Sequence, residues 1–129
     1  MTERFASAAL IAALALVACA PMDDEPEHDI RAPAAVLIGE PVNCINRQDI
    51  DNLAIHDDYT IDFKMIGGTT YRSTLPSRCP TLGFEQRISY KTATSQICST
   101  DIFHVVRSDG TQTVYCGFGK FTPVRVGGS

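Results

Sequence analysis

The sequence predicts a mainly β domain: a small antiparallel β-barrel or sandwich of six to seven short strands, with little helix after the N-terminal apolar run. Three observations lead to this prediction. Apolar and polar residues alternate over several short stretches, which is the period of a half-buried strand. Glycine and aspartate residues separate these stretches and are typical of tight turns. No long stretch of the domain shows the period of an amphipathic helix.

The clearest alternation lies in residues 59–65 (YTIDFKM), and a second strand, residues 69–75 (TTYRSTL), follows an Ile-Gly-Gly turn. A hairpin through Asp57 and Asp58 adds a preceding strand, so three strands are predicted to form an antiparallel meander. A short helical turn is predicted after Asn46. The remaining predicted elements are a strand at 87–93, a hairpin at 101–116 around Asp109-Gly110, and an edge strand at 120–124 that contains Pro123. The hairpin at 101–116 is predicted to place Val105 opposite Val114.

The register of the central hairpin follows from its side chains. A three-residue loop with Gly68 in the left-handed conformation places Phe63 opposite Tyr71 on an apolar face, and Asp62 opposite Arg72 on the other face. A two-residue loop would instead place Phe63 opposite Arg72. We therefore predict the three-residue register, with Phe63 in the core and the Asp62–Arg72 pair exposed to solvent.

The N-terminus has the organisation of a secretory leader. A charged start precedes an uncharged apolar run, residues 5–18, which is short for a membrane-spanning helix. The segment LVAC, which ends at Cys19, resembles the lipobox of bacterial lipoproteins, in which the cysteine is lipidated and becomes the first mature residue. Ordinary cleavage after Ala20 is the alternative, but it would leave Pro21 first. We predict that residues 1–18 are the signal peptide and that Cys19 is the lipid attachment site.

Residues 19–36 form a different kind of segment, which is acidic and rich in proline. Five acidic residues face only Arg31, and such a composition does not bury enough apolar surface to fold. We predict a flexible tether between the membrane and a domain of residues 37–129. Acids and bases balance from Ala34 onward, so the net charge of −4 belongs to the tether. A neutral domain gives no electrostatic footprint for nucleic acid, and no nucleic-acid partner is predicted.

Lipidation of Cys19 leaves an even number of cysteines for the domain. They are Cys44, Cys79, Cys98 and Cys116. In an oxidising compartment two disulfides are expected, and no pair has the short spacing of a zinc knuckle, which is the alternative. Three pairings are open. Because Cys116 is predicted opposite Phe103, with Cys98 at the same end of that hairpin, we favour Cys98–Cys116 and Cys44–Cys79.

Four local motifs resemble a family of small bacterial lipoproteins that is catalogued as a domain of unknown function. They are CINRQDI, YRSTLPSRCPTLGFE, ICSTDIFHV and CGFGKF. The resemblance covers nearly the whole domain, from Asn43 to about Pro123, and places each of the four domain cysteines in a recognisable frame. The family usually has a glycine where this chain has Thr81. It carries no assigned activity, so the resemblance implies no catalytic residue.

The residues themselves offer little catalytic chemistry. The histidines are His28, in the tether, His56 and His104. His56 with Asp57 and Asp58 could supply three metal ligands, but an exposed turn is the simpler interpretation. His104, predicted opposite Tyr115, is interpreted as an ordinary strand residue. We therefore predict no catalytic residue, no metal site and no cofactor.

These observations predict a cell-envelope lipoprotein with a non-catalytic binding or structural role. Its expected partners are the membrane, through the N-terminal lipid, and an envelope protein or a cell-wall component. A small periplasmic hydrolase or metal-dependent enzyme is one alternative. An inhibitor similar to the lysozyme inhibitors, which share the lipid anchor and the small disulfide-bonded β domain, is another. Ala20 at the second mature position resembles lipoproteins of the outer membrane, so the expected location is its inner leaflet, facing the periplasm.

Overall fold

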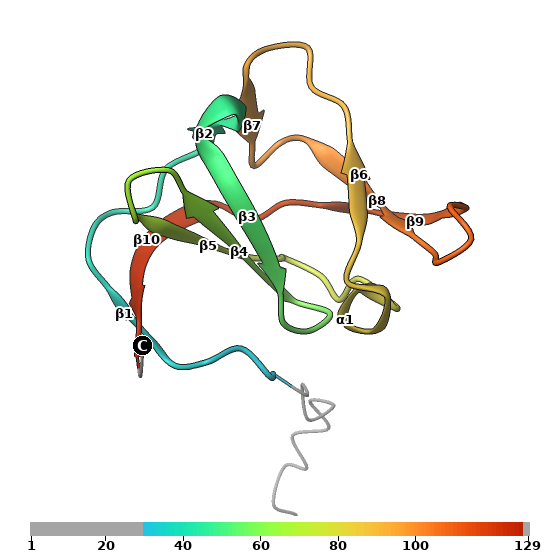
Figure 1. The fold of residues 1–129 in the computed structure, drawn as a ribbon, viewed down its shortest axis with the longest axis horizontal. Helices are drawn as coiled ribbons and strands as arrows, with labels where there is room; N and C mark the ends of the chain where they lie inside the picture. Colours follow the sequence, from blue (N-terminus) through green and yellow to red (C-terminus); the bar gives the residue numbers. More distant parts are fainter. Residues whose placement is uncertain (1–29, 128–129) are drawn as a thin grey trace, which may run out of the picture.

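The computed structural model describes residues 30–127, which contain ten strands, one short α-helix and one 3-10 helix (Figure 1). The mainly β prediction is confirmed. The strands outnumber the six to seven predicted, and they form three antiparallel sheets that are not closed into a barrel. In chain order the elements are β1 (Ala35–Leu37), β2 (Cys44–Asn46), η1 (Arg47–Asp49), β3 (Ile50–Ile55), β4 (Thr60–Met65), β5 (Thr70–Thr74), α1 (Leu82–Glu85), β6 (Ile88–Tyr90), β7 (Gln96–Cys98), β8 (Ile102–Val106), β9 (Gln112–Gly117) and β10 (Phe121–Val126). The short helical turn predicted after Asn46 is η1.

The largest sheet has five strands in the order β1-β10-β5-β4-β3. Its central hairpin has the predicted register, with Phe63 opposite Tyr71 and Asp62 opposite Arg72. Gly68, in the turn, has a φ of 98°, as a left-handed turn residue requires. Turn chemistry and side-chain alternation were therefore sufficient to fix the pairing of these two strands.

Strand β4 is buried on both faces, and this overturns the prediction that Asp62 is exposed. Asp62 has a relative exposure of 1%, close to the 0% of Phe63. The backbone amides of Arg31 and Ala32 donate to Asp57, at distances of 3.0 and 3.3 Å, which holds the chain before β1 against the β3–β4 loop. The part of the chain that was predicted as tether thus helps to enclose the polar face of the sheet (Figure 1).

The opposite face of the five-stranded sheet packs on the core. Phe63 meets Phe121 and Phe118 edge to face, with ring centroids 5.4 and 5.9 Å apart. Phe103, from the three-stranded sheet β6-β8-β9, lies 4.6 Å from Phe118. The aromatic residues of separate sheets therefore form one cluster, and such pairs stabilise a core beyond the area that they bury.

Strand β10 lies between β1 and β5, so the prediction of an edge strand at Pro123 is wrong. Strand β1 pairs with residues 124–126 only, and the ladder ends at Pro123, whose carbonyl accepts a 3.0 Å hydrogen bond from Ile38. Gly39 lies against the proline ring, because a Cβ at Gly39 would come within 2.8 Å of it. Pro123 has no N–H to donate toward β1, but the pairing of β10 with β1 stops at this residue. The proline is therefore tolerated inside the sheet. The predicted boundary between tether and domain, at residue 36, falls inside β1.

The second hairpin, β8–β9, follows the prediction only in part. Phe103 lies opposite Cys116 and His104 opposite Tyr115, as predicted. Val105 does not face Val114, because the register shifts between His104 and Val106. The extra β9 residue is typical of a β-bulge, and Val114 is 38% exposed.

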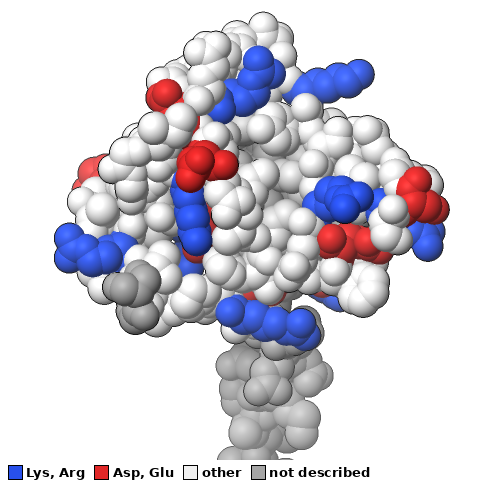
Figure 2. Space-filling model, viewed as in Figure 1, with Lys and Arg blue, Asp and Glu red and all other residues white. Residues whose placement is uncertain are grey.

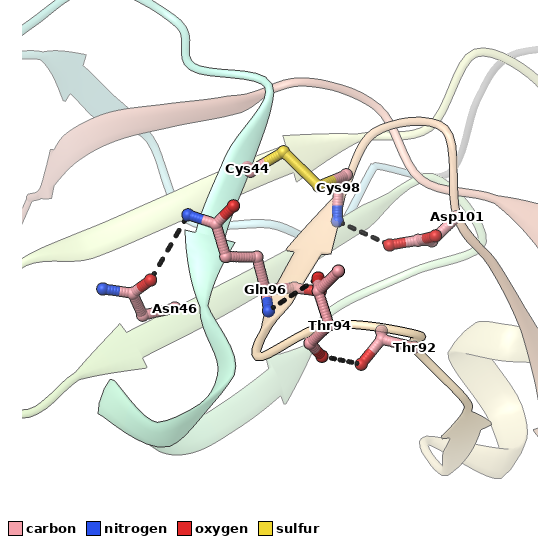
Figure 3. The surroundings of a disulfide bond; sticks show 7 residues. All are labelled: Cys44, Asn46, Thr92, Thr94, Gln96, Cys98 and Asp101. Carbon is pink, nitrogen blue, oxygen red and sulfur yellow. Dashed lines mark hydrogen bonds between the residues drawn. A yellow bond between two sulfur atoms is a disulfide. The ribbon is translucent and has the colours of Figure 1, made fainter.

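The four domain cysteines form two disulfides, but the favoured pairing is wrong. The bonds are Cys44–Cys98 and Cys79–Cys116. The error has a structural cause: residues 96–98 form a separate strand, β7, which pairs with β2 and places Cys98 directly opposite Cys44 (Figure 3). Cys116 instead meets the fully buried Cys79.

The β2–β7 ribbon is fixed by polar contacts as well as by its disulfide. The Asp101 carboxylate accepts a 2.8 Å hydrogen bond from the backbone amide of Cys98, and the Gln96 amide donates to Asn46 across the two strands (Figure 3). A two-stranded ribbon is only marginally stable alone. These contacts and the disulfide compensate for its short length.

Gly119, in the CGFGKF motif, is required by close packing. It exchanges two 3.0 Å hydrogen bonds with the Ser73 hydroxyl, and a Cβ there would overlap the carbonyl of Thr74. We expect Gly119→Ala to lower the free energy of unfolding by about 1–3 kcal/mol, measured by urea unfolding. Gly117→Ala is the matched control, since a Cβ at Gly117 meets nothing within 4 Å. Equal effects of the two substitutions would contradict this packing.

Candidate functional site

A cluster of three polar side chains lies on the enclosed face of the five-stranded sheet. Asp62 on β4 accepts two hydrogen bonds from Arg72 on β5, at 2.8 Å from Nε and 3.0 Å from Nη2. His56 follows β3, and its Nε2 lies 2.8 Å from the second Asp62 carboxylate oxygen. The predicted cross-strand register places Asp62 and Arg72 directly opposite each other, so the bidentate pair needs no further loop to position it.

The electrostatics of the cluster favour a charged carboxylate. Burial alone would raise the pKa of Asp62, but the hydrogen bonds and positive charges of Arg72 and His56 outweigh it and hold the pKa below its usual value. The hydrogen bond from Arg72 to Asp62 raises the pKa of the guanidinium in turn. The charge of Asp62 is thus neutralised inside the cluster and adds little negative potential to its surroundings.

A pocket of about 520 Å³ opens beside this cluster. Its walls come from the segment around β1, the β4–β5 turn and β10. The lining residues are Pro33, Ile38, His56, Asp62, Lys64, Gly67, Gly68, Thr69, Thr70, Val124, Arg125 and Val126. The volume is in the range of ligand-binding pockets, which combine apolar walls with a few polar groups.

Two cations of the pocket have no acidic partner among residues 30–127. Lys64 and Arg125 form no ion pair there, whereas Asp62 is paired with Arg72 and His56. Lys64, Thr70 and Val124 lie in one row across β4, β5 and β10. Val124 in this row, Pro33 and Ile38 supply apolar walls of the pocket. The pocket therefore offers positive charge next to apolar walls, which suits an anionic group.

The pair of His56 and Asp62 also has the arrangement in which a carboxylate orients an imidazole for proton transfer. Within the described residues, no hydroxyl or thiol is hydrogen-bonded to the His56 ring, and the four domain cysteines are oxidised. A nucleophile next to the base is what covalent catalysis requires. Within residues 30–127 the geometry therefore supplies an oriented imidazole but no nucleophile hydrogen-bonded to it.

The remaining residues considered from sequence lie elsewhere. Asp57 is buried and accepts backbone hydrogen bonds, including one of 2.8 Å from Tyr59. Asp58 accepts from the backbone of Gly83 at 2.8 Å and pairs with Arg78. The His-Asp-Asp segment is thus a structural junction rather than an exposed turn, and residues 30–127 contain no group of three His, Cys, Asp or Glu placed to hold a metal ion.

His104 has the predicted position and lies on the outer face of the three-stranded sheet. Its ring lies 6.1 Å from that of Tyr115, which is 70% exposed. This face is far from the pocket: β9 lies at one end of the long axis of the molecule and β1 at the other (Figure 1). Cys19, His28 and most of the tether lie outside the described residues.

Comparison with known proteins identifies a family but no characterised relative. No helix within residues 30–127 is long and apolar enough to cross a membrane. No curated protein and no solved structure gives a significant match to this chain. One family model matches residues 2–127, which include the apolar run and Cys19 as well as the whole β domain. The chain therefore belongs to the family of unknown function DUF6491.

Proposed function

We propose that this protein is a lipid-anchored, non-catalytic binding module of the bacterial cell envelope, and that its pocket holds an anionic group of an envelope component. The observation that carries the binding role is the pocket itself: Lys64 and Arg125 line it and have no ionic partner within residues 30–127, while Asp62 is already neutralised. A carboxylate or phosphate group is the complement of such a site.

The membrane anchor is supported by the lipobox at Cys19 and by the family match, which includes this segment. The fold begins close to it, because Asp57 fixes the amides of Arg31 and Ala32. The chain from Cys19 to Ile30 spans at most roughly 40 Å when it is fully extended. A lipid on Cys19 would therefore keep the domain near the membrane surface.

We expect Cys19 to carry the lipid, which can be tested by intact mass measurement of detergent-extracted protein. The mature chain should begin at Cys19 with added acyl mass, and Cys19→Ala should leave the leader uncut or release the protein from membranes. Met22→Ala, which leaves residues 1–21 unchanged, is the matched control. A mature chain that begins at Pro21 without acyl mass would refute the anchor. Fractionation that finds the protein only in the inner membrane would refute the proposed location.

We expect the pocket to bind simple anions weakly, with acetate and inorganic phosphate as probes. In an NMR titration of the mature chain, the backbone amides of Thr69 and Thr70 should shift with either probe. The double variant Lys64→Gln, Arg125→Gln should lose these shifts, because it removes both positive charges that line the pocket. Lys91→Gln with Lys120→Gln is the matched control, since neither lysine lines this pocket. Shifts that survive in the first variant would refute the anion site.

The 2.8 Å contact between His56 and Asp62 favours a second candidate, a small hydrolase in which His56 activates a water molecule. Chromogenic carboxylate and phosphate esters provide the test. Turnover that His56→Gln abolishes, with the fold preserved, would replace the binding role by catalysis. Absence of turnover with these esters would favour the binding role.

A further inference from the structure

The exposed apolar side chains of the domain are concentrated where the chain enters it. Ten large apolar side chains are exposed among the described residues, and half of them lie between residues 30 and 42. These five are Ile30, Val36, Leu37, Ile38 and Val42. Leu37 is 70% exposed and Val36 64%. Such a concentration is typical of an interaction surface, because single exposed apolar residues are otherwise scattered.

This apolar segment is continuous with the cationic pocket. Ile38 is itself a wall of the pocket, and Val36 lies directly opposite Arg125 in the β1–β10 ladder. Strand β1 forms one edge of the five-stranded sheet, and residues 35–39 contain no charge that would protect this edge from contact. In Figure 2 a blue side chain reaches the left margin of the molecule, where β1 and β10 lie in the same view (Figure 1).

We propose that this edge of the sheet, which we call the β1 face (Ile30, Val36, Leu37, Ile38, Lys64 and Arg125), docks on the phospholipid bilayer. Leu37 and Lys64 lie on one side of the edge, and Val36 and Arg125 lie on the other. The apolar side chains enter the headgroup region, and a lipid phosphate is the anion that occupies the pocket. This inference rests on the proposed anchor and anion site, and it names the membrane itself as the partner.

Three observations favour a lipid surface over another occupant. The β1 face starts at Ile30, which a lipid on Cys19 would keep within roughly 40 Å of the bilayer. Apolar side chains next to lysine and arginine are the composition of segments that lie in a membrane interface. The cations of the pocket complement lipid phosphates. Docking would direct β9, with the exposed Tyr115, away from the membrane (Figure 1).

The test uses the absence of tryptophan from the chain. Leu37→Trp and Tyr115→Trp each introduce a single fluorophore, at positions that are equally exposed at 70%. Both lipidated variants are reconstituted into vesicles of phosphatidylethanolamine and phosphatidylglycerol that contain phospholipids with brominated acyl chains. We expect a blue shift and loss of most of the emission for Leu37→Trp, and neither change for Tyr115→Trp.

Further measurements separate this inference from those on which it rests. Flotation of the vesicles reports the anchor independently, since both variants should float whether or not the β1 face docks. Adding Lys64→Gln and Arg125→Gln to Leu37→Trp should reduce the quenching, as should replacing the anionic lipid by phosphatidylcholine. Glycerol phosphate in solution should not reduce it, because a soluble phosphate lacks the apolar part of the partner.

Three results would overturn the inference. The first is equal quenching of the Leu37→Trp and Tyr115→Trp proteins, each reconstituted separately into the same vesicles. The second is a blue shift of Leu37→Trp that depends on protein concentration in detergent and accompanies crosslinked dimers, which would assign the β1 face to a second copy of the chain. The third is a carbodiimide crosslink from Lys64 to the acidic tether in the vesicle-bound protein, which would show that the tether occupies the pocket.

Discussion

Asp62→Ala is expected to lower the free energy of unfolding by about 3–5 kcal/mol, the usual cost of removing one partner from a buried ion pair. Asp62 is 1% exposed, and its carboxylate binds both Arg72 and His56. Its removal leaves a half-buried guanidinium without its counter-charge. Urea unfolding of the mature chain measures the effect, and Asp51→Ala, on the exposed side of β3, should change stability by less than about 0.5 kcal/mol. Equal effects of the two substitutions would show that the cluster is open to water.

The same carboxylate predicts a dependence of stability on pH. The pKa of Asp62 is lower in the folded chain than in the unfolded chain, where it is about 3.9. Its contribution is therefore fully present above about pH 4 and is lost as the pH falls through the folded-state pKa. The difference in stability between the wild type and Asp62→Asn should be constant near neutral pH and should shrink in acid. A difference that grows as the pH falls would contradict the direction of the shift.

Phe63→Ala is expected to cost about 3–5 kcal/mol, as for other buried phenylalanines. Phe63 is fully buried and contacts the rings of Phe118 and Phe121, so its loss leaves a cavity where the sheets meet. Ile66→Ala, at the turn that ends the same strand, is the control because Ile66 is 68% exposed. Thermal unfolding of the two variants gives the comparison. A small effect of Phe63→Ala would mean that the aromatic cluster does not hold the sheets together.

The hairpin register could be predicted from sequence because it depends on neighbours in the chain. Alternation sorts the residues of β4 and β5 into two faces, and the turn between them fixes their offset. Alternation within β4 does not show that both of its faces are covered, because the cover comes from residues 30–38, most of which lie in the predicted tether. The burial of Asp62 is therefore a tertiary effect.

The pocket and the disulfides were beyond sequence reasoning for a related reason. The alternation placed Asp62 and Lys64 on one face, but Arg125 and Ile38 reach the same pocket only through β10 and β1, which are distant in the chain. The cysteine pairing depends on the three-residue strand β7, which is too short to produce a clear period.

Thr81 stands at a position where the family that this chain resembles usually has a glycine, and the backbone conformation there accounts for that glycine. Its φ of 67° lies in the left-handed region, which a β-branched residue rarely adopts and in which glycine is favoured. The glycine that the family usually has at this position therefore fits the backbone conformation better than the threonine of this chain.

The attachment of the first strand determines how the domain would respond to mechanical tension. A force that pulls on the N-terminus acts first on the two hydrogen bonds that Arg31 and Ala32 donate to Asp57, and then on the short β1–β10 pairing. Peeling stops at Cys44, because its disulfide to Cys98 is covalent. The released chain, residues 30–43, spans at most roughly 50 Å. The load then passes through the disulfide to Cys98, so residues 45–97 are not extended, and the N-terminal strand can act as an extensible link in series with a rigid body.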